Sequence, residues 1–417
     1  MCTATKHTAG QFAGLQSLRR PYMRARHGLI FTFFISLSLF ACAEEQRTPL
    51  GAQHAAGGGG ASSAGGAKAD GTRPIAIFLP SHGDVDDFEE IEPYIRSAFL
   101  KNVGVPLPKT LRQLLQDPAY WLSRKMIEEQ YAVIGPTRYR ENAQLQMEAL
   151  QRELDRRGVP ARVYIGYNFM PSFIEETAAQ MRADGVREIV VFNKGAQYSL
   201  ATLGESIDEL EHYLDENPEW EVKVTAVRQF SDDPRFIDLF EETLRRDVET
   251  HFAEIPPADV CILIASHGLP LRLIKMGDPA VDQMRATFAE REDRMAEFPL
   301  YHGFLNDDFF PGAEWVSPSA PDVAHEMRSV SCPAVLMDAR LSFTTHHRAT
   351  LYDLDVDARE ILEEPDTLSD GITPHPLWSP AKVVLAEQWD DDEGFARLIA
   401  DLSEEALRGE GDLIKVR

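Results

Sequence analysis

The sequence predicts an α/β fold made of two similar halves, with parallel sheets flanked by helices and a cleft between the halves. The first observation is a set of short apolar, β-branched runs bounded by Gly and Pro, which are typical of strands buried on both faces. The second is that these runs alternate with helical segments, as in parallel sheets with right-handed crossovers. The third is that Ser-His-Gly follows the run 261–265 directly and the run 75–79 after a single residue, Pro80. The shared ending indicates an internal repeat.

The predicted elements follow one another from Pro74. Strands are expected at 75–79, 163–167, 188–192, 222–227, 261–265 and 333–337. One helical face carries Ala143, Met147, Leu150 and Leu154, and Gly158 follows as a C-cap. Ser172 and Glu175 are expected to form a capping box at the start of the next helix, and further helices follow Gly204, Asp233 and Pro279. We place the two halves at 74–235 and 236–417.

Residues 1–42 have the pattern of a secretory signal peptide. A basic segment precedes the apolar run 28–40, and a small residue precedes Cys42. The end of this run is similar to a bacterial lipobox, so Cys42 is the predicted lipidation site, with Met23 as an alternative start. Residues 43–73 are rich in Gly, Ala and Ser and are expected to form a flexible linker. The alternative to a signal peptide is that the apolar run 28–40 is fortuitous.

These features predict a membrane-anchored periplasmic lipoprotein, or a cytoplasmic protein if the N-terminus is misread.

The 417 residues, 44% of them hydrophobic, are enough for one large or two ordinary α/β domains. The net charge is −25 and no basic stripe is present, so nucleic acid is not expected as a partner.

The four cysteines, Cys2, Cys42, Cys261 and Cys332, show no Cys-x-x-Cys spacing. The sequence therefore supports neither a disulfide framework nor an iron–sulfur cluster. Cys261 and Cys332 lie in apolar runs and are expected to be buried free thiols.

His267 is the first candidate for chemistry. It follows a buried strand, and ligands in open α/β sheets bind beyond the carboxyl ends of strands. A neutral imidazole accepts a proton near pH 7 or binds a borderline metal. The alternative is that Ser-His-Gly is only a polar turn. His82 is a further candidate ligand if it points into the cleft, although a capping or turn role is the favoured interpretation.

Four patches together resemble the ferrochelatase family, which inserts ferrous iron into a porphyrin. They are Tyr164-Ile165-Gly166-Tyr167, Gln197-Tyr198-Ser199, Ser266-His267-Gly268-Leu269-Pro270 with Gly277-Asp278-Pro279, and Trp315-Val316-Ser317-Pro318 with the segment 343–355. The resemblance implies two Rossmann-like halves with the porphyrin in the cleft between them. It implies that His267 is the active-site metal ligand or proton acceptor.

The same resemblance implies the partners and the binding residues. The substrates would be a protoporphyrin- or coproporphyrin-type macrocycle and a divalent metal, Fe²⁺, with no permanently bound cofactor. Porphyrin contacts would come from Tyr167, Asn168, Tyr198 and Trp315. The family often has Arg-Tyr where this chain has Asn168-Phe169, so a propionate contact is altered.

One departure affects the expected chemistry directly. The family motif is Asp-His-x-Glu-Thr-Leu, and this chain has His346, His347 and Ala349 at the Asp, His and Glu positions. Loss of such an acid typically lowers a rate by ~10²–10⁴-fold. His346 and His347 either take over its role or belong to a decayed site.

Asp353 and Asp357 follow Ala349 at helical spacing, so on a helix all three positions share a face. The resemblance implies that these acids form an outer relay for metal or protons and that His267 is a metal ligand. Three functions thus remain open: iron insertion into a porphyrin, an impaired membrane-tethered paralogue that binds haem, porphyrin or metal, and chelation of another tetrapyrrole or metal.

Overall fold

The computed structural model describes residues 74–105, 107–306, 313–330, 332–363 and 382–417, and all of these belong to one compact unit. The predicted signal peptide, Cys42 and the linker lie outside the described residues. Among the helices that are described, none is long and apolar enough to cross a membrane.

The first sheet has the strand order β2-β1-β3-β4-β9. Its strands are β1 (Ile75–Ser81), β2 (Ala161–Tyr167), β3 (Glu188–Phe192), β4 (Lys223–Val227) and β9 (Leu413–Lys415). The first four are parallel, with Ile75 of β1 opposite Ala161 of β2 and Glu188 of β3, and β9 is antiparallel to β4.

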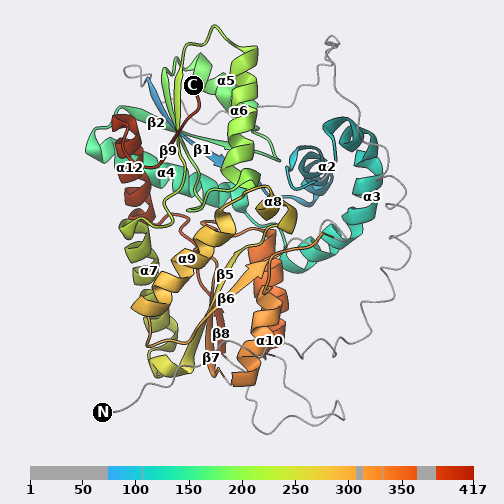
Figure 1. Ribbon diagram of the computed structural model, residues 1–417, viewed down its shortest axis with the longest axis vertical. Helices are drawn as coiled ribbons and strands as arrows, with labels where there is room; N and C mark the ends of the chain where they lie inside the picture. Colours follow the sequence, from blue (N-terminus) through green and yellow to red (C-terminus); the bar gives the residue numbers. More distant parts are fainter. Residues whose placement is uncertain (1–73, 106, 307–312, 331, 364–381) are drawn as a thin grey trace. The chain divides into compact units, whose positions relative to one another are not determined.

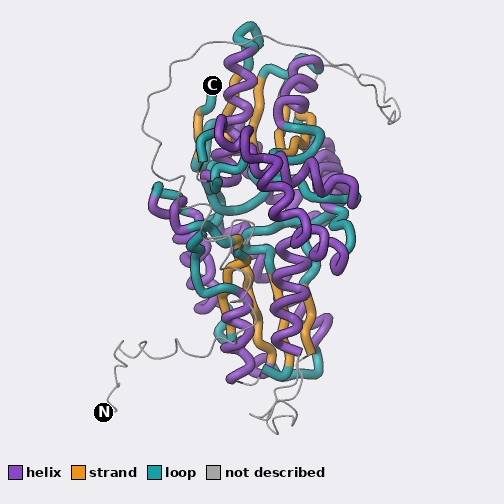
Figure 2. The backbone as a smooth tube through the Cα atoms, turned by 90° about the vertical axis from the view of Figure 1, so that its right-hand side faces the viewer, coloured by secondary structure: helices purple, strands orange, loops and turns teal. Residues whose placement is uncertain are grey.

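The second sheet repeats this plan with the order β6-β5-β7-β8, all parallel. Its strands are β5 (Val260–His267), β6 (Leu300–Leu305), β7 (Ala334–Asp338) and β8 (Lys382–Leu385). β5 occupies the position that β1 has in the first sheet. The two Ser-His-Gly segments therefore end equivalent strands, and the predicted α/β fold with two related halves is confirmed. Figure 2 shows the two groups of strands, each with helices on both sides.

Helices cover both faces of each sheet (Figure 1). The first sheet packs against α4 (Tyr139–Arg157) and α12 (Glu393–Arg408) on one face, and against α5 (Ile174–Ala183) and α6 (Glu205–Glu216) on the other. The second sheet packs on one face against α7 (Pro234–Phe252), α8 (Leu271–Lys275) and α9 (Ala280–Arg294). On the other face it packs against α10 (Ala320–Val330), η5 (Thr350–Ala358) and α11 (Arg359–Glu363). The helices α2 (Ile91–Lys101) and α3 (Lys109–Ile134) pack on each other, and short helical turns are η2 (Phe88–Glu90), η3 (Leu200–Gly204) and η4 (Pro257–Asp259).

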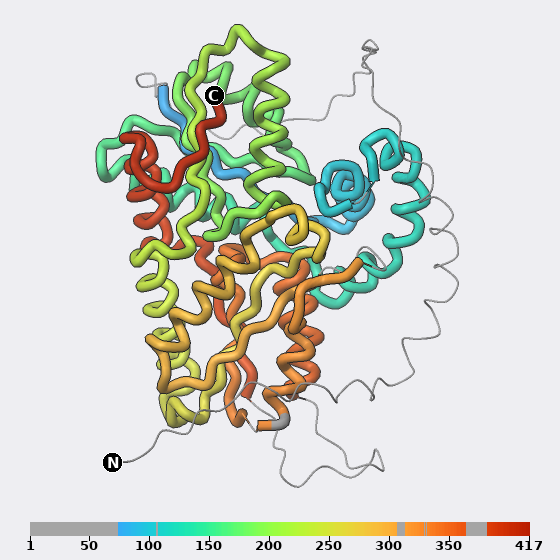
Figure 3. The backbone as a smooth tube through the Cα atoms, viewed as in Figure 1, coloured from blue at the N-terminus to red at the C-terminus, as the bar shows by residue number. Residues whose placement is uncertain are grey.

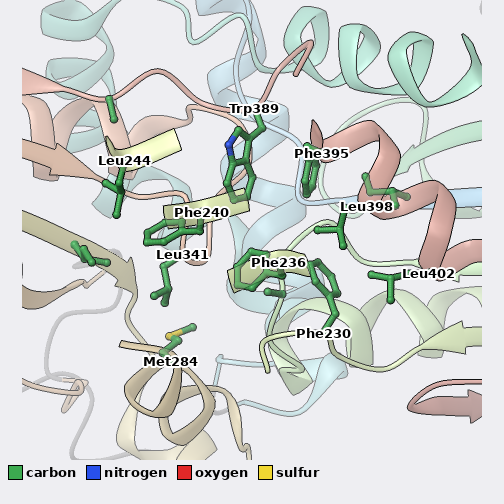
Figure 4. Close-up of a cluster of buried hydrophobic side chains, with 14 of the residues drawn as sticks. Phe230, Phe236, Phe240, Leu244, Met284, Leu341, Trp389, Phe395, Leu398 and Leu402 are labelled. Atoms are coloured by element: carbon green, nitrogen blue, oxygen red, sulfur yellow. The ribbon is translucent and has the colours of Figure 1, made fainter. Parts of the chain in front are cut away.

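Alternating side chains of the central strands enter different cores. In β1, Ile77 and Leu79 join one core, while Ala76 and Phe78 join another. The core that contains Ile77 continues into the second half, because residues of β5, α7 and α12 share it. Figure 4 shows its aromatic centre, where Trp389 lies among phenylalanines of α7 and α12. Burial on both faces explains why these strands are apolar runs rather than alternating patterns.

The predicted division at 235/236 assigns the whole of the chain after residue 235 to the second half. The end of the chain returns to the first half, because β9 pairs with β4 and α12 packs on α4 (Figure 3). The range 236–417 therefore does not form the second half alone.

Two local predictions also need correction. Cys261 and Cys332 form a disulfide rather than two free thiols, because β5 and β7 are neighbours in the sheet. The capping bond of α5 is made one residue later than expected, with the Phe173 N–H donating to Glu176 at 2.9 Å.

Candidate active site

A cleft lies where the carboxyl ends of the two sheets face each other. Its walls come from the segments that follow β1, β3, β5 and β7. In each sheet these are the two adjacent central strands between which the order of connection reverses: β1 and β3 in the first sheet, β5 and β7 in the second. Such switch points are where open α/β sheets bind ligands. The repeat thus brings two switch points to one cleft.

The glycines of the two Ser-His-Gly segments are required by local geometry. Gly83 has a φ of +86°, which favours glycine. A Cβ on Gly268 would lie 2.6 Å from the Leu305 carbonyl oxygen, so no larger residue fits without a shift. Gly83 lets the backbone turn directly after His82, and Gly268 lets the backbone after His267 pass close to the end of β6. His82 and His267 both line the cleft.

His267 lines the cleft at the end of β5, as predicted. The backbone N–H of His267 donates to the Ser342 hydroxyl at 2.8 Å, and this hydrogen bond joins the end of β5 to the segment after β7. Its ring centre lies 5.6 Å from that of Phe343 in an edge-on arrangement. The position of His267 is therefore set by both central strands of the second sheet.

His347 lies on the other side of Phe343, with the two ring centres 4.4 Å apart. The Ala349 N–H donates to His347 Nδ1 at 3.0 Å, so the neutral ring carries its proton on Nε2. Burial, reinforced by the charges of His82 and His267, holds the pKa of His347 well below its ordinary value. The ring is neutral at pH 7, and Nε2 is a hydrogen-bond donor in this conformation.

His82 supplies a third imidazole from the first half. Its Nε2 lies 3.3 Å from the Tyr94 hydroxyl, and its ring packs edge-on against Phe169 at 4.5 Å. Three histidines from three loops thus line one cleft.

His346 does not line the cleft, unlike His347. Its Nδ1 lies 3.3 Å from the Thr350 hydroxyl, which itself donates to the His347 carbonyl. Burial lowers the pKa of His346 to about 4. His346 is placed to support the turn that carries His347, and Ala349 lines the cleft beside that turn.

Asp353 and Asp357 lie on η5, which is a π-helix and not the α-helix that the spacing suggested. The wider π turn changes the angle between positions four apart. Among the residues described, no three His, Cys, Asp or Glu side chains gather closely enough to hold a metal ion. His267, Asp353 and Asp357 therefore do not form a ready-made metal site.

The four predicted porphyrin contacts divide into two pairs. Asn168 and Trp315 line the cleft, and Trp315 is held there by backbone pairing with Pro270. Tyr167 and Tyr198 are not among the lining residues. Tyr167 packs in the core around α2, α3 and α4, and the Tyr198 ring lies under the guanidinium of Arg228 at 5.3 Å.

Asp84 was missed because its partners are distant in sequence. The Tyr131 hydroxyl and the Val85 N–H donate to Oδ1, and the Arg348 N–H donates to Oδ2 at 2.8 Å. Burial raises the pKa of Asp84, and these hydrogen bonds oppose that shift. Asp84 therefore ties the loop after β1 to the turn that carries His347. The buried Lys194 also lines the cleft and was not predicted.

Comparison with known proteins agrees with this geometry. The ferrochelatase family model matches residues 74–407. The chain is 28% identical to a ferrochelatase of Cyanothece sp., covering 70% of this chain and 75% of the relative. It is 25% identical to the mitochondrial ferrochelatase of Bos taurus, covering 73% of this chain and 74% of the relative.

Among solved structures, SirB from Bacillus subtilis with Fe3+ matches with a TM-score of 0.48 and 11% identity, covering 81% of this chain and 98% of SirB. The family match spans most of the chain and includes both switch points of the cleft. The chain therefore belongs to the ferrochelatase family, and this membership supports insertion of a metal ion into a tetrapyrrole.

Proposed function

We propose that the protein inserts Fe²⁺ into a protoporphyrin- or coproporphyrin-type macrocycle, as in the last step of haem biosynthesis. The observation that carries the proposal is His267, which lines the cleft at the switch point of the second sheet. Metallation displaces two pyrrole N–H protons and the water ligands of the ion. A neutral imidazole can accept such a proton or bind the ion.

We assign different roles to the histidines within this proposal. In the conformation described, His347 already carries a proton on Nε2 because Nδ1 accepts from the Ala349 N–H. It is therefore suited to orient the substrate by donating a hydrogen bond. Proton acceptance falls first to His267, with His82 as the second imidazole at the cleft.

The alternative is a tethered paralogue that binds the macrocycle or metal without turnover. Ala349 favours this alternative, because a methyl group at the cleft neither accepts a proton nor binds metal. The three histidines that line the cleft favour the enzyme, because imidazoles can accept a proton or bind a metal ion. Chelation of a different metal or tetrapyrrole by the same cleft is the third candidate.

The test is an anaerobic assay of the full chain with protoporphyrin IX and Fe²⁺ or Zn²⁺, followed by loss of porphyrin fluorescence. We expect turnover by the wild type, a loss of about 100-fold or more in His267→Ala, and a faster rate in Ala349→Glu. His212→Ala, an exposed histidine on α6, is the matched control and should leave the rate unchanged. Porphyrin binding without turnover, with activity appearing only in Ala349→Glu, would establish the binding paralogue instead.

We also propose that the protein is exported and anchored to the membrane through Cys42, on the periplasmic side. The Cys261–Cys332 disulfide supports this location, because disulfides persist in oxidising compartments and are rare in the cytosol. Labelling of cells with a palmitate analogue should mark the wild type and not Cys42→Ser. Equal labelling of the two proteins would contradict the anchor.

A further inference from the structure

Lys194 is a buried cation in the wall of the cleft. It follows β3, is only 5% exposed, and lines the cleft together with Tyr139. Its ammonium donates to Gln146 Oε1 at 2.7 Å and lies 5.7 Å from the centre of the Tyr139 ring. A buried charge is costly unless its surroundings or a ligand compensate for it.

The partner of Lys194 is held rigidly. Gln146 belongs to α4 and is 3% exposed. Its Nε2 donates to the Thr344 carbonyl at 2.7 Å and to the Trp389 carbonyl at 3.1 Å, which fixes the amide with Oε1 facing the lysine. Because Thr344 lies in the loop after β7, the lysine is anchored to both halves of the cleft.

The hydrogen-bonding capacity of this ammonium is only partly used. An ammonium has three donors, and Gln146 takes one of them among the described residues. Asp390 attracts the charge of Lys194 from a distance, without an ion pair between them in the described structure. Other lysines differ: Lys101 pairs with Glu209 at 3.0 Å, and Lys223 with Glu188 at 2.6 Å.

We propose that Lys194 binds a carboxylate arm of the macrocycle, and so helps to select and orient an acidic tetrapyrrole. The inference rests on the function proposed above. A carboxylate would accept from the two unused donors and neutralise the buried charge, forming a charge-assisted hydrogen bond. The divalent ion is excluded as the ligand of this group, because two cations repel each other.

The experiment compares protoporphyrin IX with its dimethyl ester, which lacks the charged carboxylates. Binding of each to the full chain is measured by fluorescence titration in the same detergent, for the wild type and for Lys194→Met, Lys194→Arg and Lys223→Met. We expect Lys194→Met to bind the free acid about tenfold to a hundredfold more weakly and the ester almost unchanged. Lys194→Arg should keep its preference for the acid, and Lys223→Met should match the wild type.

Two results would overturn the inference while leaving the proposed function intact. One is a wild type that binds acid and ester equally well. The other is a Lys194→Met protein that loses affinity for both ligands to the same extent. If the wild type binds neither ligand, the porphyrin function fails as well. Because the acid and ester comparison uses the wild type, it can overturn the inference even if Lys194→Met does not fold.

Discussion

Glu205 is a buried titratable residue that the proposed chemistry does not use. It opens α6, is 6% exposed, and neither of its carboxyl oxygens has a hydrogen-bond partner in the described part of the chain. Burial, reinforced by the charge of Glu209, raises the pKa of Glu205 from 4.5 to about 9. Below pH 4.5 the folded and unfolded states are both protonated. Between these values only the unfolded state ionises, so the residue lowers stability by up to about 1.4 kcal/mol per pH unit.

Glu205→Gln should therefore raise the unfolding temperature at pH 8 and change it little at pH 5. The measurement is thermal unfolding followed by circular dichroism at both pH values. Glu216→Gln, an exposed position on the same helix, is the control and should show no such pH-dependent gain. A gain of the same size at pH 5 and pH 8 would mean that the Glu205 carboxyl is not held protonated by the fold.

At the scale of elements, the disulfide joins Cys261 of β5 to Cys332, which lies two positions before the start of β7. The two cysteines are 71 residues apart in sequence. A link across such a loop stabilises the folded state by about 4 kcal/mol, because it lowers the conformational entropy of the unfolded chain. Reduction should thus lower the midpoint of urea unfolding substantially. The measurement is a urea titration with and without a strong reductant.

The double variant Cys261→Ala/Cys332→Ala serves as the control for this prediction. It should unfold near the midpoint of the reduced wild type, and added reductant should not change it. If the oxidised wild type and the double variant had equal midpoints, the link would contribute nothing to stability.

At the scale of the whole molecule, the two halves share elements and should not fold separately. A fragment of residues 74–235 lacks β9, which pairs with β4, and α12, whose Phe395 and Leu398 are buried in the shared core. We expect this fragment to lack fixed tertiary packing, because the face of its sheet that α4 and α12 cover together keeps only α4. Fusion of residues 386–417 to it should restore a near-ultraviolet circular dichroism signal, since these residues supply the missing layer.

A matched fusion with Leu398→Asp tests whether the effect comes from packing. The charged residue would enter the core at a position 3% exposed, so no signal should be restored. A well-ordered fragment 74–235 on its own would contradict the shared architecture.

The fold class and the central candidate residue of the site follow from the amino-acid sequence alone. Strands such as 261–265 are buried on both faces, and a strand of this kind has a continuous apolar run in its own sequence. The two Ser-His-Gly segments marked equivalent strands because the same three residues follow a buried apolar run in each half. His267 was predictable as a candidate because it directly ends a buried strand, although its exact position also depends on the hydrogen bond to Ser342.

Only the tertiary structure decided the contacts between distant segments. The return of β9 to the first sheet, the pairing of Cys261 with Cys332, and the link from Asp84 to Arg348 join residues far apart in sequence. Local periodicity has the same form whichever partner a strand or side chain meets, so it does not encode these pairings. The same limit explains why Lys194 was not predicted: its burial and its place in the cleft wall arise only when α4, β3 and the loop after β7 come together.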